Sequence, residues 1–434
     1  MSQGFWGNLE SEIIANNTVK NELYEKFEVK RGLRNADGSG VLAGLSQISS
    51  VIGSKKTDVG QEPVEGKLSY RGIDINDLIQ QISSPAHDCF EKTVFLLLVG
   101  RLPNDAEYKA IKDTIEAENT VPDDLVVGLI KNLPSKNIMN KLQTVVSGLY
   151  TLDDDAESSD PVANVEKAVA IIAKLPMIVA YGYLAQYQPN ARFVPAPKNK
   201  TVAESFLTML RQGDSSSDLE NDILDLCLCL HAEHGGGNNS TFTTYVVSSS
   251  GSDVYCTLAA AIASLKGPLH GAANKMVMDM MADIKENVSD WSNLQELRAY
   301  LAKIVRKEVG DKSGKIYGLG HAVYTQSDPR AGILKKKARE LAEAKGRLDE
   351  FNLYCAIEEE GPGVFNEVKG SDKVIAPNVD FFSGFVYDCL GIPEEVYTPM
   401  FAMARSAGWA AHRIEEMLSG KRVIRPGYKY VGGL

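Results

Sequence analysis

Apolar residues recur at intervals of three and four along most of the chain, which is the spacing of one buried face of an α-helix. This pattern predicts helices, broken at proline, glycine and asparagine, over 77–230, 274–286, 292–310, 331–346 and 398–418. No regular alternation of strand and helix patterns, of the kind that builds a parallel sheet, is visible. The fold is therefore predicted to be mainly α.

The N-terminal part has a different pattern. Residues 42–75 alternate short apolar stretches with glycine, proline and charge, which predicts a few short strands or hairpins. Proline also predicts two breaks farther along the chain. A long apolar helix over 164–184 is expected to be interrupted near Pro176, and 358–363 is expected to form a loop.

Composition and charge limit the partners that we expect. The chain has 434 residues, of which 44% are hydrophobic, and a net charge of −11, which argues against nucleic acid or an anionic membrane as partner. No basic segment followed by an apolar one opens the chain, so we expect no signal peptide, no membrane span and a cytoplasmic location. Cys227 and Cys229 lie in an apolar run and are expected to be buried thiols rather than metal ligands.

Four of the six histidines lie in short segments rich in glycine or asparagine, where the backbone can approach a ligand closely. His231 and His234 belong to HAEHGGGNN, His270 to GPLHGAAN, and His321 to KIYGLGHAVY. Imidazole exchanges protons near neutral pH, so these segments are candidates for acid–base chemistry. GPLHGAAN lies between two predicted helices and is expected to form a loop.

Several functions suggested by these segments can be excluded. A metal site built on His231 and His234 would need a third ligand at HExxH-like spacing, which is absent. An esterase oxyanion loop would need a G-x-S-x-G elbow, which is also absent. Gly318 and Gly320 lack the third glycine of a dinucleotide-binding loop. What remains is a helix that ends in a loop binding a small polar ligand, with a histidine as hydrogen-bond donor.

Charged residues in apolar surroundings are further candidates. Asp380 is either a helix N-cap or a base whose pKa burial raises above ~3.9. Arg330 follows His321 by nine residues, and Arg405 lies in a helix among small apolar residues. Arg405 needs an anionic partner, which could be a ligand or a carboxylate of the chain. Arg330 and the His321 loop could together hold an oxyanion and a carboxylate. Arg425 lies near the C-terminus, where most arginines are simply exposed.

Together these motifs resemble the citrate synthase family over nearly the whole chain, from Tyr70 to Pro426. The resemblance is strongest in four blocks that follow the family's order and spacing: 231–240, 267–274, 318–330 and 377–384. It implies a helical fold of two domains and a homodimer with an active site between the domains. The large domain would comprise 1–270 and 386–434, and the small domain 271–385.

The resemblance also implies a role for each candidate. Asp380 would remove a methyl proton from acetyl-CoA, His270 would bond to the thioester oxygen, and His321 would donate to the ketone of oxaloacetate. Oxaloacetate would also be held by His234, Asn238, Arg330, Arg405 and, across the dimer, Arg425. Coenzyme A would contact Ile316, Tyr317, Gly318, Leu319 and Asn274. No metal or cofactor is expected, because the coenzyme A thioester is a substrate.

Three alternatives stay open. The first is a 2-methylcitrate synthase that uses propionyl-CoA, since one extra methylene is worth only ~1–3 kcal/mol of discrimination. The second is a catalytically silent relative that binds a dicarboxylate or coenzyme A. The complete set of His270, His321 and Asp380 argues against it. The third is an unrelated helical scaffold.

Overall fold

A computed structural model describes residues 6–35, 38–57 and 60–432. The chain divides into two compact units, a terminal unit (Met1–Leu45 with Ile424–Leu434) and a main unit (Ser46–Val423). Residues 1–5, 36–37, 58–59 and 433–434 of the predicted large domain lie outside the described residues.

The terminal unit joins the two ends of the chain. Its elements are η1 (Gly7–Leu9), α1 (Glu10–Asn17), α2 (Asn21–Lys26) and η2 (Arg31–Leu33). The ammonium of Lys429 lies 4.7 Å from the ring centre of Phe27, a cation–π contact between the two ends.

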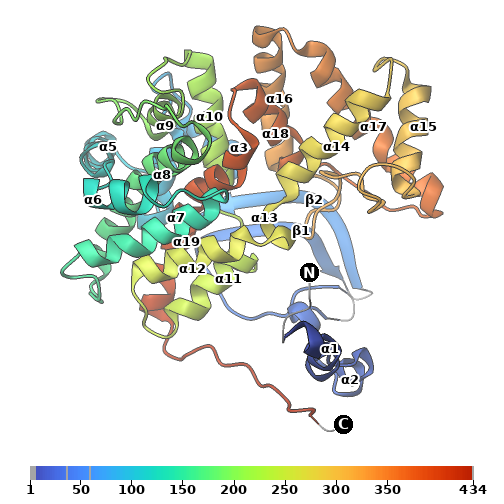
Figure 1. Cartoon of the computed structure of the whole chain (residues 1–434), viewed down its shortest axis with the longest axis horizontal. Coiled ribbons are helices and arrows are strands. Elements are labelled where there is room, and N and C mark those ends of the chain that lie inside the picture. Colours follow the sequence, from blue (N-terminus) through green and yellow to red (C-terminus); the bar gives the residue numbers. More distant parts are fainter. Residues whose placement is uncertain (1–5, 36–37, 58–59, 433–434) are drawn as a thin grey trace. The chain divides into compact units, whose positions relative to one another are not determined.

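The main unit is mainly α, as predicted (Figure 1). One group of its helices comes from residues 75–271 and from the final helix of the chain. These helices are α3 (Ile75–Ile82), α4 (Cys89–Val99), α5 (Asp105–Glu118), α6 (Asp123–Leu125), α7 (Ile138–Leu149), α8 (Pro161–Tyr187), α9 (Val202–Leu210), α10 (Asp218–His231), α11 (Asn239–Ser248), α12 (Val254–Lys266), α13 (Pro268–Gly271) and α19 (Tyr397–Ser419). Shorter turns of helix are η3 (Val126–Lys131), η4 (Tyr150–Leu152) and η5 (Glu394–Val396).

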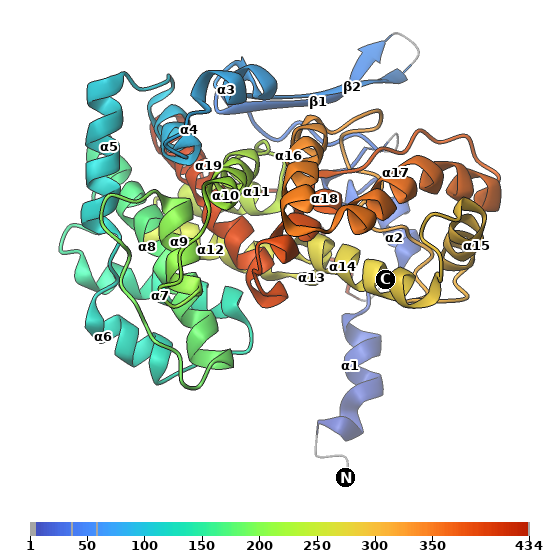
Figure 2. The ribbon, with the colours of Figure 1, turned by 90° about the horizontal axis from the view of Figure 1, so that it is seen from above.

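A second group of helices lies together on one side of the main unit in both views (Figures 1 and 2). It consists of α14 (Ala273–Asn287), α15 (Leu294–Val305), α16 (Pro329–Lys345), α17 (Leu348–Lys369) and α18 (Val379–Cys389). Within the group, α16 contacts α17 and α18, α15 contacts α17, and α14 contacts α18. The predicted small domain, 271–385, contains four of these helices and most of α18, and its boundaries stay a prediction.

The strands predicted within 42–75 are confirmed. They are β1 (Ser49–Thr57), β2 (Gly60–Tyr70) and β3 (Ile73–Asp74), in an antiparallel sheet of order β1-β2-β3. Ser49 pairs with Tyr70 and Thr57 with Gly60, so β1 and β2 form one long hairpin. The register shifts between Ile52 and Ser54.

Both breaks predicted from proline are wrong. α8 continues through Pro176 and α17 continues through Pro362. An internal proline costs a helix about 3 kcal/mol, and the burial of many apolar side chains offsets this cost in α8. In α17, a Cβ on Gly361 would lie 2.5 Å from the Leu319 side chain, so close packing there requires the glycine that had suggested a loop.

Among the described residues, α8 alone is long and apolar enough to cross a membrane by length and composition. However, 78% of its most apolar window is buried inside the structure. This is weak evidence for a membrane span, because the core helix of a soluble protein meets the same criteria.

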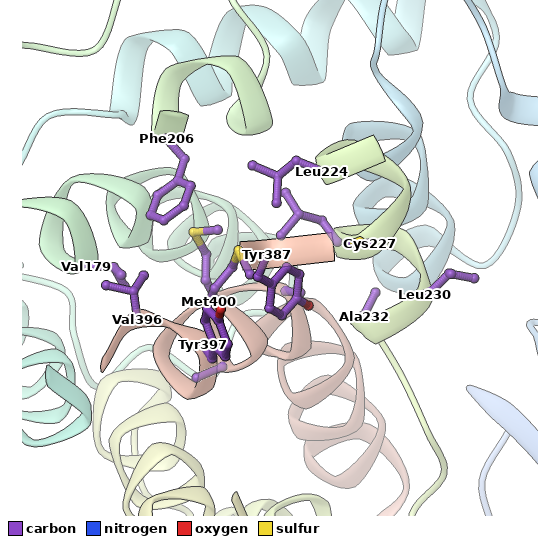
Figure 3. Close-up of a cluster of buried hydrophobic side chains, with 14 of the residues drawn as sticks. Val179, Phe206, Leu224, Cys227, Leu230, Ala232, Tyr387, Val396, Tyr397 and Met400 are labelled. Carbon is purple, nitrogen blue, oxygen red and sulfur yellow. The ribbon is translucent and has the colours of Figure 1, made fainter. Parts of the chain in front are cut away.

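The hydrophobic core joins α18 to α10 and α19. Figure 3 shows Tyr387 of α18 beside Cys227 of α10 and Met400 of α19, and all three side chains are buried. Cys227 and Cys229 are buried thiols, as predicted. The Tyr387 hydroxyl also lies 2.6 Å from Nε2 of His231, so this core fixes the end of α10 from which the histidine-rich loop starts.

Candidate active site

Backbone hydrogen bonds hold the segment of His321 beside the start of α18. The N–H of Gly320 donates to the carbonyl of Ala376 over 2.7 Å. The side chain of Asn378 donates in return to the carbonyl of Gly320 over 2.8 Å. His321 follows the first segment directly, and Asp380 follows the second by two residues. The structure therefore brings together two candidates that are far apart in sequence.

Gly318 permits this close approach. Its φ is +81°, which disfavours a side chain, and a Cβ would lie 2.5 Å from the Phe381 ring. The neighbouring Ile316 is buried, and Leu319 packs against Gly361. These side chains support packing, so the predicted contact of 316–319 with coenzyme A stays a prediction.

His321 is held as a neutral hydrogen-bond donor. Its Nδ1 accepts hydrogen bonds from the backbone N–H groups of Val323 (3.0 Å) and Tyr324 (3.1 Å). Because Nδ1 is an acceptor, the proton of the neutral ring lies on Nε2. Burial, aided by the charge of Arg330, lowers the pKa of His321 to about 4. At neutral pH the ring can therefore donate through Nε2 without carrying a charge.

Asp380 is not the N-cap of its helix, so that interpretation is wrong. Asn378 is the cap, because its Oδ1 accepts from the N–H of Asp380 over 3.0 Å. Burial raises the pKa of Asp380 to about 6, although the charges of Arg330 and Arg405 act in the opposite direction. The carboxylate is therefore deprotonated at neutral pH and is a stronger base than an exposed aspartate.

Arg330 has a carboxylate partner within the chain. Its Nε and Nη2 donate to the two oxygens of Asp328 over 3.0 and 2.8 Å, and both residues are buried. Asp328 also accepts from the N–H of Val379 over 3.2 Å, which connects α16 to α18. Arg330 is thus paired within the chain, and its contact with oxaloacetate stays a prediction.

Arg405 lacks such a partner. Its side chain is buried, and Nε donates to the carbonyl of His231 over 2.5 Å. Its guanidinium lies 4.6 Å from the ring centre of Phe401, and none of the ion pairs between described residues includes it. Burial lowers the pKa of Arg405 to about 10, so it still carries its charge at neutral pH. A buried cation in this state favours an anionic ligand.

His234 lies in the same cluster. Its ring centre is 5.1 Å from that of His321 and 5.4 Å from that of Tyr324, and the ring of Tyr324 stacks on His321 at 4.8 Å. Burial, with the charges of Arg330 and Arg405 adding to it, lowers the pKa of His234 well below its ordinary value. Its buried Nε2 has no hydrogen-bond partner among the described residues. This buried ring nitrogen is therefore available for a ligand.

His270 lies on α13, a single turn of helix within the predicted loop, and is held by a serine that the sequence did not single out. Its Nε2 lies 2.7 Å from the hydroxyl of Ser240. This hydroxyl also lies 3.0 Å from Oδ1 of Asn238, which caps α11. Burial, with the charge of Arg405, lowers the pKa of His270, so the ring is neutral at neutral pH.

The single hydroxyl proton of Ser240 can go to only one of these two neighbours. Donation to Oδ1 of Asn238 lets Nε2–H of His270 donate to Ser240, whereas donation to His270 leaves the proton of the imidazole on Nδ1, where the ring can donate to a ligand. Asn238 precedes Ser240 by two residues, so the sequence could have indicated the cap. It could not have indicated the contact with His270, which exists only in the folded chain.

Two of the predicted binding residues make no contact described above with the histidine and arginine cluster. Asn274 is buried between α14 and α18, where its Nδ2 donates to the hydroxyl of Ser383 over 2.5 Å. This gives it a packing role, and its contact with coenzyme A stays a prediction. Arg425 is exposed and belongs to the terminal unit, so its predicted role also stays open.

A buried ion pair supports the His234 loop. Oε1 of Glu233 lies 2.9 Å from Nε2 of His412 and accepts from the N–H of Gly235 over 2.5 Å. Burial opposes charge on both partners, but each stabilises the other. The pKa of Glu233 falls to about 2 and that of His412 rises to about 9. No pattern in the sequence pairs these two residues.

The described residues contain no group of three or more histidine, cysteine or acidic side chains that could hold a metal ion. The cluster itself supplies a carboxylate, imidazole rings and buried guanidinium groups.

The sequence is similar to known proteins along almost its whole length. Residues 36–427 match the family model described as citrate synthase, C-terminal domain. The chain is 35% identical to citrate synthase 2 of Bacillus subtilis, covering 91% of this chain and 94% of that protein. It is 32% identical to 2-methylcitrate synthase 1 of Corynebacterium glutamicum, covering 93% of this chain and 96% of that protein.

A solved structure has the same fold. It is the ternary complex of the citrate synthase of Thermoplasma acidophilum with carboxymethyl coenzyme A and oxaloacetate. The TM-score is 0.76 at 28% identity, and the similarity covers 94% of this chain and 97% of that chain.

Proposed function

Because the chain belongs to the citrate synthase family, which consists of acyltransferases, we propose that it condenses acetyl-CoA with oxaloacetate and releases citrate and coenzyme A. One observation carries the proposal. A half-buried carboxylate, Asp380, and a neutral imidazole donor, His321, stand on two segments that hydrogen bonds join. The first suits removal of a proton from carbon, and the second suits polarisation of a ketone.

The first step is removal of a methyl proton from acetyl-CoA. This proton is weakly acidic, so a base on carbon and a donor on oxygen must act together. Asp380 takes the proton, and His270 donates to the thioester oxygen as the enol forms. The contact with Ser240 orients His270 for this role.

The second step forms the carbon–carbon bond. The enol carbon attacks the ketone carbon of oxaloacetate, and His321 donates through Nε2 to the oxygen on which charge develops. The product is citryl-CoA. Water then cleaves its thioester bond, which yields citrate and free coenzyme A.

Binding of oxaloacetate is assigned to buried cations and neutral donors. Arg405 supplies a guanidinium that no ion pair of the described residues uses, and guanidinium groups bind carboxylates in a bidentate manner. His234 and Arg330 complete this group. We also assign Asn238, whose side chain caps α11, to the residues that contact oxaloacetate. No resident metal or cofactor takes part in these steps, so a chelator should leave activity unchanged.

The test of the function follows free thiol while purified protein is mixed with oxaloacetate and acetyl-CoA. We expect release of coenzyme A that depends on oxaloacetate. Binding of oxaloacetate without any release would instead support a silent relative. Absence of both binding and release would contradict the proposal.

The second candidate function is that of a 2-methylcitrate synthase, because such an enzyme is 32% identical over most of the chain. The same base and donors would serve propionyl-CoA. The ratio of kcat/KM for acetyl-CoA and propionyl-CoA separates the two, and we expect acetyl-CoA to be preferred.

We further propose a cytoplasmic homodimer in which the partner's Arg425 completes each site. Two inactive variants test this arrangement. A mixed dimer of His270→Ala and Arg425→Ala subunits would contain one site with both residues intact. Activity should therefore return when the two proteins exchange subunits. Sedimentation as a monomer, or exchange without recovery, would contradict the proposal.

A further inference from the structure

The β1–β2 hairpin lies against the segment that follows His321. The hydroxyl of Thr325 donates to the carbonyl of Gly53 over 3.1 Å. The N–H of Gly66 donates to the hydroxyl of Ser327 over 3.0 Å. Each strand of the hairpin thus makes a hydrogen bond to this segment, although the hairpin precedes it by more than two hundred and fifty residues.

Glycine at two positions makes this contact possible. A Cβ on Gly66 would lie 1.9 Å from the carbonyl oxygen of Ser327 and 2.8 Å from the Tyr324 ring. A Cβ on Gly53 would lie 2.2 Å from the carbonyl oxygen of Val323. Neither glycine has a positive φ, so both are required for space and not for backbone conformation.

The same segment determines the orientation of His321. The N–H groups of Val323 and Tyr324 donate to Nδ1, and the ring of Tyr324 stacks on the imidazole with an interplanar angle of 28°. A displacement of 323–327 therefore changes both the direction of the ring and the bonds that keep its proton on Nε2.

The hairpin also contacts the loop of His234. The hydroxyl of Ser49 donates to Oε1 of Glu233 over 2.8 Å, and the hydroxyl of Tyr70 donates to its carbonyl over 3.0 Å. A Cβ on Gly235 would lie 3.0 Å from the Val51 side chain. One rigid element therefore bridges the two histidine segments.

We propose that the β1–β2 hairpin positions His321, and that Gly53 and Gly66 are positioning residues for the binding and polarisation of the ketone substrate. The inference rests on the proposed function. Close backbone approach at Gly53 and Gly66, together with the hydrogen bonds of Thr325 and Ser327, sets the place of the donor.

The test compares Gly53→Ala and Gly66→Ala with Gly332→Ala, whose Cβ would meet nothing within 4 Å. Misplacement by about 1 Å can cost ~10²-fold in rate. We expect kcat to fall at least ~10-fold in the first two variants. Calorimetry should show weaker oxaloacetate binding in both, and the control should match the parent protein. If both variants fold and have the same kcat and the same oxaloacetate affinity as the parent protein, the inference is overturned.

A spectroscopic measurement separates this inference from the proposed function. Histidine rings labelled with ¹⁵N report the Nε2–H tautomer of His321, assigned with His321→Gln. Both alanine variants should change this signal even if the parent protein releases no coenzyme A. A loss of activity together with an unchanged His321 signal would indicate general damage and would overturn the inference.

Should the alanine variants fail to fold, Thr325→Val provides a milder change. It removes one hydrogen bond between the segment and the hairpin. We expect a smaller shift of the same kind in the His321 signal and in oxaloacetate affinity. No change in either would overturn the inference.

Discussion

Nδ2 of Asn378 donates to the carbonyl of Gly320 over 2.8 Å, so one side chain connects the His321 segment to the helix that carries the base. Oδ1 of the same side chain caps α18. An aspartate could replace the cap but not the donor. We therefore predict that Asn378→Asp keeps its stability within about 1 kcal/mol and loses kcat, whereas Asn378→Ala loses both. Urea unfolding and steady-state kinetics measure the two effects, and equal kcat in Asn378→Asp and the parent would refute the role of the donor.

Replacement of the base is the most direct test of the chemistry. Asp380→Asn should lower kcat by about 10²–10⁴-fold, the usual contribution of a general base, and should bind oxaloacetate nearly as before. Asp372→Asn, at an exposed position, is the matched control. Turnover that survives in Asp380→Asn would show that the base is misassigned.

The pH dependence of kcat/KM follows from two titrating groups. Burial raises the pKa of Asp380 to about 6, and only the deprotonated form is a base. The rate should therefore rise with pH through about 6 and then level off. Burial lowers the pKa of His321 to about 4, so this ring stays neutral over the pH range in which Asp380 titrates. It should therefore add no second pH-dependent change in the rate. If the residual kcat/KM of Asp380→Asn still rises with pH through about 6, another group is responsible for the pH dependence.

Ser240→Ala tests the orientation of His270. The change removes a hydrogen bond of 2.7 Å to Nε2, so the imidazole can adopt the wrong tautomer. We expect kcat to fall about 10-fold or more with little change in oxaloacetate affinity. Ser250→Ala, at an exposed serine just beyond the same helix, should behave as the parent. Thiol-release kinetics would contradict the prediction if both variants were equally active.

The buried pair of Glu233 and His412 should stabilise the fold in a defined pH range. His412, with its pKa raised from 6.5 to about 9, contributes fully below pH 6.5 and loses its contribution as pH rises through 9. Glu233, with its pKa lowered from 4.5 to about 2, contributes fully above pH 4.5 and loses its contribution as pH falls through 2. The stabilisation is therefore greatest between pH 4.5 and 6.5.

Loss of one partner leaves the other charge buried. His412→Gln should cost about 3–5 kcal/mol of unfolding free energy in this range. The double variant with Glu233→Gln should cost less than the sum of the single changes. Urea unfolding across pH measures the coupling, and additive costs would show that the two groups do not interact.

The helical pattern was sufficient to predict a mainly α fold. The resemblance of four blocks supplied the candidate site residues, and their roles stay predictions. His234 and His321 lie together, with ring centres 5.1 Å apart, and Arg405 donates to the carbonyl of His231. Arg330 pairs with Asp328, which also accepts from the N–H of Val379 beside Asp380. Residue type indicates candidates for the site because few side chains can act as a neutral hydrogen-bond donor, a permanent cation or a base whose pKa depends on burial.

Local rules failed where packing opposed them. Pro176 and Pro362 lie inside helices because tertiary burial outweighs their local cost. Asp380 is two residues from the cap position because Asn378 occupies it. For the two prolines the deciding interactions involve atoms that are distant in the sequence, and a periodicity argument does not include them. For Asp380 the deciding residue is local, because the neighbouring asparagine forms the cap.

Only the tertiary structure decided which residues hold the chemical groups in place. Ser240 meets His270, His412 meets Glu233, and Gly66 meets Ser327 through contacts between distant segments. The sequence by itself determined which chemical groups are present. Their protonation, orientation and distance depend on burial and on neighbours that come together when the chain folds.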